Sequence, residues 1–133
     1  MPARPLILLA EDEAMIQLAL EAALEDGGFE VLCVSSSADA LAVLEHRISS
    51  IAGLVTDIRM GAGPKGWEVA RRARELNDAI AVVYVSGDSA EEWPSLGVPN
   101  SIMLQKPFAE AQLITAISSL LNETGGHRHP PLA

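Results

Sequence analysis

Five short apolar runs, each four to six residues long, alternate along the chain with longer segments of helical periodicity. Apolar residues at nearly every position of a run are typical of strands buried on both faces, as in a parallel sheet that helices cover. Regular alternation of such strands with helices predicts an α/β fold, an open doubly wound parallel sheet with helices on both faces. The runs are residues 6–10, 31–34, 53–56, 80–85 and 101–104.

The segments between the runs predict amphipathic helices, because apolar residues recur there at helical spacing. The first helix should end at Gly27, a typical C-cap residue. Ser36 followed by Asp39 offers a capping-box start for the second. The predicted helices cover residues 14–24, 38–47, a segment after Gly66 that includes residues 69–76, and residues 109–121.

The segment between the fourth and fifth runs is less regular. It contains Gly87, Pro94 and Pro99, and such residues interrupt helices. We therefore expect only a short fourth helix, at residues 89–93. Trp93 in this segment, and Trp67 in the third helix, are expected to be half-buried.

Size and charge narrow the possible functions. A chain of 133 residues that is 49% apolar can form one domain with a real core. We expect this domain over residues 1–124 and a flexible tail over residues 125–133. The net charge of −9 repels phosphate backbones and anionic lipids, which argues against nucleic-acid or membrane binding. A single cysteine and no targeting segment predict a cytoplasmic protein.

Polar side chains follow four of the five runs: Glu11 and Asp12 the first, Asp57 the third, Ser86 the fourth and Lys106 the fifth. Ligands of open parallel sheets bind at the carboxyl ends of the strands, so we expect these side chains to converge. Crowded carboxylates are stable mainly with a hard cation such as Mg²⁺, which commonly binds together with a phosphate. The pattern predicts a magnesium and phosphoryl site, in which Asp57 could accept the phosphoryl group.

The pattern resembles the receiver domain of bacterial two-component response regulators, the CheY-like family. The resemblance covers residues 6–121. It implies a flavodoxin-like sheet of strand order 2-1-3-4-5, and phosphorylation of Asp57 by a phosphohistidine on a partner kinase. The matching motifs are Glu11-Asp12, Asp57-Ile58-Arg59-Met60, Ser86-Gly87 and Lys106-Pro107-Phe108.

The resemblance also implies a role for each site residue. Asp12, Asp57 and the backbone carbonyl of Arg59 would hold Mg²⁺, with Glu11 acting largely through water. The phosphoryl oxygens would be bound by Ser86 and Lys106, with a cis peptide between Lys106 and Pro107. Gly87 would leave the phosphoryl group open to attack.

The sequence departs from the family pattern in three places. Met103 stands where the family usually has Tyr or Phe, three residues before the lysine. The loop after Asp57 is one residue longer than common versions and lacks the proline that often follows the methionine. The fourth helix, part of the usual output face, should be short.

The leading hypothesis is a single-domain response regulator that is not an enzyme beyond self-catalysed phosphotransfer and dephosphorylation. A sensor histidine kinase or a histidine phosphotransfer protein would phosphorylate it. It would signal by contact with an unidentified protein, because no output module follows Leu121. We expect a monomer or a weak homodimer.

Several alternatives remain open. A receiver-like adaptor that ignores phosphorylation is suggested by Met103 and the short fourth segment. A magnesium-dependent phosphatase with an aspartate nucleophile would need a second Asp at position 59, where this chain has Arg59. A flavodoxin-type electron carrier is disfavoured by the acidic turn at residues 11–13, which would repel a flavin phosphate. Helix capping would explain single acidic residues, but less easily the whole set.

Overall fold

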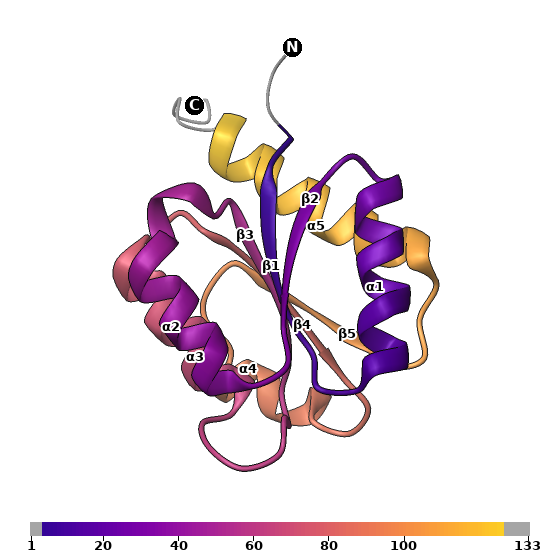
Figure 1. Ribbon diagram of the computed structural model, residues 1–133, viewed down its shortest axis with the longest axis vertical. Coiled ribbons are helices and arrows are strands. Elements are labelled where there is room, and N and C mark those ends of the chain that lie inside the picture. The colour runs from indigo at the N-terminus through magenta and orange to yellow at the C-terminus, as the bar shows by residue number, and fades with distance from the viewer. Residues whose placement is uncertain (1–3, 127–133) are drawn as a thin grey trace.

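A five-stranded parallel sheet forms the centre of the molecule (Figure 1). The computed structural model describes residues 4–126. The strand order is β2-β1-β3-β4-β5, and every neighbouring pair is parallel, which confirms the predicted doubly wound topology. The strands are β1 (Leu6–Ala10), β2 (Glu30–Val34), β3 (Gly53–Asp57), β4 (Ala81–Ser86) and β5 (Ser101–Gln105).

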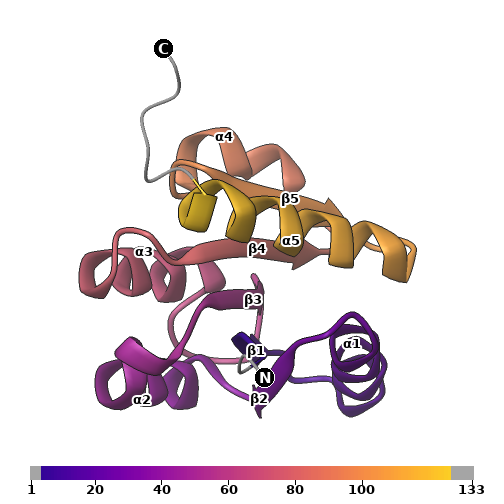
Figure 2. The ribbon, with the colours of Figure 1, turned by 90° about the horizontal axis from the view of Figure 1, so that it is seen from above.

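Helices cover both faces of the sheet (Figure 2). One face is covered by α1 (Ala14–Asp26) and α5 (Glu110–Gly126), and the other by α2 (Ser37–Arg47) and α3 (Gly66–Leu76). The short helix α4 (Trp93–Leu96) lies beyond β4, near the β5 edge. Two 3₁₀ turns, η1 (Ile48–Ser50) and η2 (Ala90–Glu92), complete the described elements.

The three inner strands are buried on both faces, as their continuous apolar sequences predict. The core has two halves, one on each face of the sheet. Leu44, Trp67 and Tyr84 belong to the half under α2 and α3. Leu24 and Ile117 belong to the half under α1 and α5. Each face of the sheet is therefore covered by its own pair of helices. The loops meet at the carboxyl ends of the strands.

Two predicted helix ends are confirmed. The Ser36 side chain accepts a hydrogen bond from the backbone N–H of Asp39 (3.1 Å) and so caps α2. At the C-terminal end of α1, the N–H of Gly27 donates to the carbonyl of Ala23 (3.0 Å).

The last helix differs from the prediction. It continues to Gly126, whereas the apolar pattern suggested an end at Leu121, because helical hydrogen bonds do not require apolar side chains. The expected domain boundary after residue 124 therefore falls within its final turn. Residues 127–133 of the expected tail lie outside the described residues. Over residues 4–126, the structure has no helix that is both long and apolar enough to span a bilayer.

The fourth helix is short, as predicted; the 3₁₀ turn η2 lies within the predicted residues 89–93, and the α-helical turn follows it at residues 93–96. Pro94 occupies its first turn, where a missing N–H breaks no helical hydrogen bond. The prediction for Trp67 is wrong, because this side chain is only 3% exposed and its ring contacts Tyr84, with 4.7 Å between ring centroids. Its position at the start of α3 directs it into the core.

Candidate functional site

The carboxyl ends of four of the five strands carry the predicted site residues. Asp57 and Ser86 are the last residues of β3 and β4, so each strand ends one residue later than the apolar run that predicted it. Glu11 follows β1 directly, and Lys106 follows β5. Because β1 pairs with β3, and β4 with both β3 and β5, the strand ends bring all four residues to one edge.

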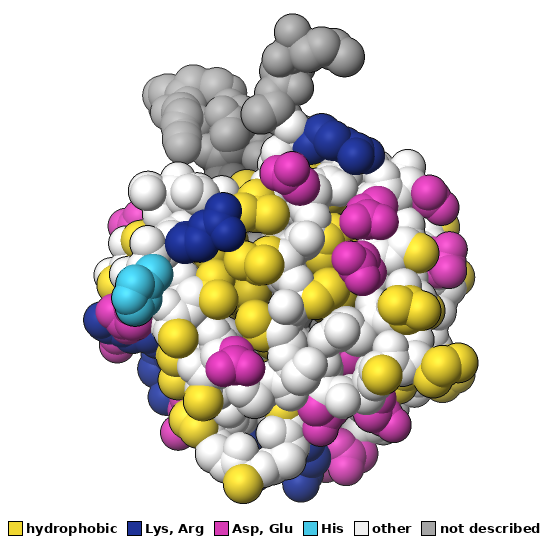
Figure 3. Space-filling model, in the orientation of Figure 1, with side chains coloured by type: hydrophobic (Ala, Val, Ile, Leu, Met, Phe, Trp, Pro, Cys, Tyr) yellow, Lys and Arg dark blue, Asp and Glu magenta, His cyan; other side chains and the backbone are white. Residues whose placement is uncertain are grey.

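Three carboxylates form a cluster at this edge. One oxygen each of Glu11, Asp12 and Asp57 lies within 4.8 Å of the other two. The three side chains differ in burial, since Glu11 is fully buried, Asp57 is 7% exposed and Asp12 is exposed. Figure 3 shows acidic side chains at the lower edge of the molecule, where the strands end. The cluster is open to a ligand from the side of Asp12.

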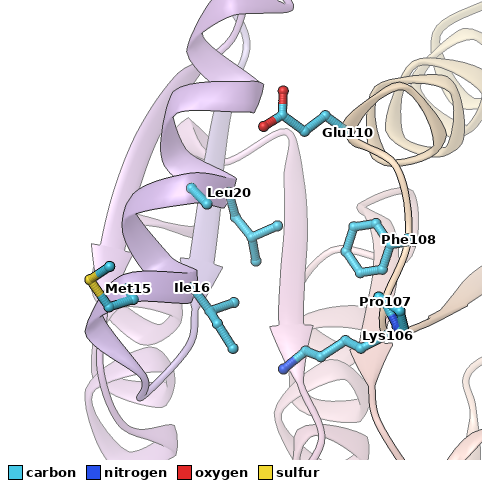
Figure 4. Close-up of a pocket in the computed structure, with 8 residues that line it drawn as sticks. Met15, Ile16, Leu20, Lys106, Pro107, Phe108 and Glu110 are labelled. Atoms are coloured by element: carbon cyan, nitrogen blue, oxygen red, sulfur yellow. The ribbon is translucent and has the colours of Figure 1, made fainter.

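Lys106 supplies the positive charge inside the cluster. Its Nζ lies 3.3 Å from Oε1 of Glu11 and 3.4 Å from Oδ2 of Asp57. Figure 4 shows its side chain extending from the loop after β5 toward the strand ends. One ammonium against three carboxylates leaves excess negative charge.

The pKa values of the buried groups reflect this imbalance. Burial raises the pKa of Glu11, and the charge of Asp57 adds to the increase, although the backbone N–H of Glu13 and Lys106 oppose it. Burial lowers the pKa of Lys106, but the charges of Asp57 and Glu11 outweigh burial, so its pKa is raised overall. The surroundings of the site therefore disfavour the charged form of Glu11 and favour the protonated form of Lys106.

The loop after β3 fixes the orientation of Asp57. The backbone N–H of Ile58 donates to Oδ1 of Asp57 (2.7 Å), which leaves Oδ2 toward Lys106. Gly66, at the start of α3, donates its N–H to the carbonyl of Ile58 (2.8 Å). A Cβ at position 66 would lie 2.2 Å from the carbonyl oxygen of Asp57, so only glycine allows this close approach.

Ser86 is buried and its hydroxyl oxygen is already used as an acceptor. It accepts backbone N–H groups from Asp88 (3.2 Å) and Ser89 (2.9 Å). The hydroxyl proton is not required by either bond, so it can be donated to a ligand oxygen. At the next position, a Cβ on Gly87 would meet no atom within 4 Å.

The side chain of Arg59 makes contacts that the sequence analysis did not anticipate. Its Nε lies 3.4 Å from Oδ1 of Asp88 and 3.3 Å from Oγ of Ser89. The guanidinium thus connects the loop after β3 with the loop after β4. No local pattern indicated this contact, because the partners are 29 and 30 residues apart and meet only through the pairing of β3 with β4.

A second unanticipated contact comes from α1. The side-chain amide of Gln17 donates to the backbone carbonyls of Glu11 (3.0 Å) and Val34 (3.1 Å). The only signal in the sequence is a polar residue amid apolar ones over residues 14–20.

The donor set fits Mg²⁺. Carboxylate oxygens are the ligands that this cation prefers, and three are within reach of one another. A divalent cation would neutralise the charge that Lys106 leaves unbalanced. The residues present therefore support a hard-cation site next to Asp57.

A match to a family model supports the same interpretation. Residues 7–118 match the model described as response regulator receiver domain. The chain belongs to the response regulator receiver family. This receiver therefore has the fold and the place in two-component signalling that the sequence motifs implied.

Individual relatives agree with the assignment. A solved structure of a response regulator receiver protein from Sinorhizobium medicae WSM419 is 52% identical, with a TM-score of 0.88 over 91% of this chain and 97% of that one. The response regulator receiver protein CpdR of Brucella abortus is 33% identical over 117 residues, 86% of this chain and 95% of that protein. The transcriptional regulatory protein TctD of Salmonella typhimurium is 33% identical over 125 residues, 92% of this chain. This receiver spans only 54% of TctD.

The receiver has no aromatic ring at position 103. Met103 is half-buried in β5 and lies opposite Tyr84 of β4. Tyr84 is fully buried, and its hydroxyl accepts the backbone N–H of Val98 (3.0 Å), before β5. An aromatic side chain is therefore present on the neighbouring strand β4, where it anchors the loop between α4 and β5.

Two further expectations concern Lys106 and its surroundings. The Lys106–Pro107 peptide is cis, as the family resemblance implied. Beside it, Pro107 and Phe108 line a groove of about 390 Å³ together with residues of α1, including Met15 and Ile16 (Figure 4). Met15 is 82% exposed, so this receiver presents apolar surface next to the acidic cluster.

Proposed function

We propose that this receiver accepts a phosphoryl group on Asp57 in the presence of Mg²⁺. The observation that carries the proposal is the position of Asp57, with Oδ2 3.4 Å from the Lys106 ammonium and one oxygen within 4.8 Å of those of Glu11 and Asp12. A carboxylate held among other carboxylates and a lysine suits a nucleophile whose product is an anion.

The proposed metal ligands are Asp12, Asp57 and the backbone carbonyl of Arg59, with Glu11 acting through water. Bound Mg²⁺ would neutralise charge on the phosphoryl oxygens as they approach the carboxylates. The burial of Glu11 and the exposure of Asp12 suit these different roles. A buried carboxylate can hold a bound water in place, whereas an exposed one can contact the ion directly.

Each remaining residue has a distinct task. An oxygen of Asp57 attacks the phosphorus of a phosphohistidine, the P–N bond breaks, and its electron pair returns to the imidazole nitrogen. Lys106 pairs with the transferred phosphoryl oxygens, for which its raised pKa keeps it charged. Ser86 donates its free hydroxyl proton to another phosphoryl oxygen. The open space at Gly87 leaves room for an attacking water.

The proposed donor is a sensor histidine kinase or a histidine phosphotransfer protein. Exposed Met15 and the groove beside Phe108 give such a partner an apolar contact next to Asp57. The receiver would act as a phosphoacceptor in the cytoplasm, with no enzymatic turnover beyond self-catalysed phosphotransfer and dephosphorylation.

We also propose that the signal leaves by protein contact, through the surface around β5. Residues 93–105 and 111–122 contain no charged side chain, although the chain carries a net charge of −9. Ile102 and Leu104 of β5 line a groove of about 410 Å³ with residues of α5. The match to CpdR, which covers 95% of that protein, supports action as a single-domain regulator. We further propose that the receiver is a monomer or a weak homodimer.

The test is the mass of the intact protein after incubation with Mg²⁺ and acetyl phosphate. We expect one added phosphoryl group, which Asp57→Asn and a chelator both abolish. A labelled Asp57→Asn protein would remove the assignment of the nucleophile. If acetyl phosphate fails, the same measurement is repeated with a phosphorylated histidine phosphotransfer protein as donor, and failure with both contradicts the proposal.

A receiver-like adaptor that ignores phosphorylation is the second candidate. It is favoured by Met103, because the family's usual aromatic readout is missing there. Amide chemical shifts of β5 and α5, compared with and without phosphorylation, separate the two functions. Unchanged shifts on a fully phosphorylated protein would favour the adaptor. A phosphatase is disfavoured, because Arg59 occupies the position of the required acid and is engaged with Asp88.

A further inference from the structure

The acidic turn between β1 and α1 carries two of the three clustered carboxylates but has little local support. Glu13 occupies the N-cap position of α1 without making a side-chain capping bond. Its own N–H donates to Oε2 of Glu11 (3.1 Å), so the turn depends on the carboxylate that it must position. Mutual repulsion among Glu11, Asp12 and Asp57 acts to spread the turn when no cation is bound.

Gln17, near the start of α1, donates hydrogen bonds to this turn. Its backbone N–H donates to the carbonyl of Glu13 (2.8 Å) and its side-chain amide to the carbonyl of Glu11 (3.0 Å). The same amide reaches the carbonyl of Val34 (3.1 Å), the last residue of β2. Because the amide has two N–H groups, both carbonyls can be satisfied at once.

These bonds tie the turn to the sheet. The N–H of Glu11 also donates to the carbonyl of Val34 (3.1 Å), which extends the pairing of β1 with β2 by one residue. Gln17 closes the other side of this junction, so that the backbone of Glu11 is held through both its N–H and its C=O. The side chain of Glu11, which is fully buried, can then move little.

We propose that Gln17 is a positioning residue for the cation site, holding the Glu11–Asp12 turn in the geometry that Mg²⁺ needs. This inference rests on the proposed function, because it takes the acidic cluster to bind Mg²⁺. Gln17 acts through the backbone of the turn and touches neither the ion nor the phosphoryl group. Residues that orient metal ligands in this way contribute substantially to metal affinity.

The test compares Gln17→Met with Gln112→Met by calorimetric titration of Mg²⁺. Methionine keeps the length of the side chain but removes the amide. Gln112 is a matched control, because its Oε1 accepts the backbone N–H of Ala109 (2.7 Å) at the start of α5. We expect Gln17→Met to raise the Kd for Mg²⁺ about tenfold and Gln112→Met to leave it unchanged.

Amide hydrogen exchange without Mg²⁺ gives a second readout. The amides of Glu11 and Glu13 should exchange faster in Gln17→Met, while those of the other strands are unchanged. If Gln17→Met does not fold, Gln17→Asn, which keeps the amide but withdraws it by one methylene, takes its place.

The outcomes separate this inference from the proposed function. If the unmodified receiver binds no Mg²⁺, the proposed cation site is wrong. Should it bind while Gln17→Met binds equally well, only the inference about Gln17 is overturned. An equal loss of affinity in Gln17→Met and Gln112→Met would show a general effect of helix stability and would also overturn it.

Discussion

Neighbouring residues in the acidic turn have opposite environments. Glu11 is fully buried, whereas Asp12 is exposed. A buried carboxylate loses its hydration, and Lys106 does not fully compensate, since the pKa of Glu11 remains raised. The chain thus gives up stability at this residue in exchange for a site that attracts a cation.

Replacing Glu11 should therefore stabilise the metal-free protein. We expect Glu11→Gln to raise the free energy of unfolding by about 1 kcal/mol at neutral pH. Because the raised pKa favours the protonated form in the native state, the advantage should shrink as pH falls toward 4.5, the ordinary value for this group. Urea unfolding in the presence of a chelator, over a pH series, measures the difference. A destabilised Glu11→Gln would contradict this account of the site.

Lys106 should have the opposite pH dependence. Its folded pKa is raised above the ordinary 10.5, so its stabilising effect is complete below pH 10.5 and is lost as pH rises through the folded value. We expect Lys106→Met to lower the free energy of unfolding by about 2 kcal/mol at pH 8. The gap between the two proteins should close in more alkaline urea titrations. If the difference in the free energy of unfolding persists unchanged when the ammonium is deprotonated, the effect of Lys106 comes from packing and not from its charge.

Among the elements, the segment before β5 depends on a side chain from α3. The guanidinium of Arg74 donates to the backbone carbonyls of Ile80, Pro99 and Asn100. Asn100 adopts a positive φ of 58°, and Tyr84 holds the nearby N–H of Val98. Because α4 is only four residues long, these bonds replace the support that a longer helix would give.

Loss of Arg74 should loosen this segment. We expect Arg74→Met to cost about 2 kcal/mol of stability and to accelerate amide exchange over residues 97–101. Arg72→Met is the matched control on the same helix, where an exposed arginine pairs with Glu45 and Glu75. Exposed pairs contribute at most about 1 kcal/mol, so the control should be milder. Equal effects of the two variants in urea unfolding would refute the special role of Arg74.

At the scale of the whole molecule, charge and ligand binding are linked. The net charge of −9 and the carboxylate cluster both favour cation binding by the folded state. Figure 3 shows further acidic side chains on the side formed by α1. Unfolding separates Asp57 from the adjacent pair Glu11 and Asp12, so a cation bound at the cluster stabilises the native state.

Mg²⁺ should therefore raise the stability of the protein. We expect an increase of about 1.4 kcal/mol at a Mg²⁺ concentration ten times its Kd. Asp12→Asn should lose this increment while remaining folded, because Asp12 is exposed and makes none of the core contacts. Thermal unfolding with Mg²⁺ and with a chelator provides the measurement. The same increment in Asp12→Asn would place the cation elsewhere.

Local sequence was sufficient for the elements of the fold. Apolar runs and helical periodicity are set by neighbouring residues, so the five strands, the long helices and the cap at Ser36 could be predicted. Boundaries were less well determined, as the length of α5 shows, because chain ends and helix ends depend on weaker signals. The strand order came from the resemblance to a family, since the apolar runs alone do not rank strands.

Only the tertiary structure decided the environment of each site residue. Motifs placed Glu11, Asp57 and Lys106 at one edge, but not the burial of Glu11 or the bridge that Lys106 makes from 95 residues away. The contacts of Gln17 and Arg59 also depend on which strand ends lie side by side. Sequence patterns record the preferences of a residue and its neighbours along the chain. Burial and charge pairing arise from residues distant in sequence, and these are fixed only when the sheet assembles.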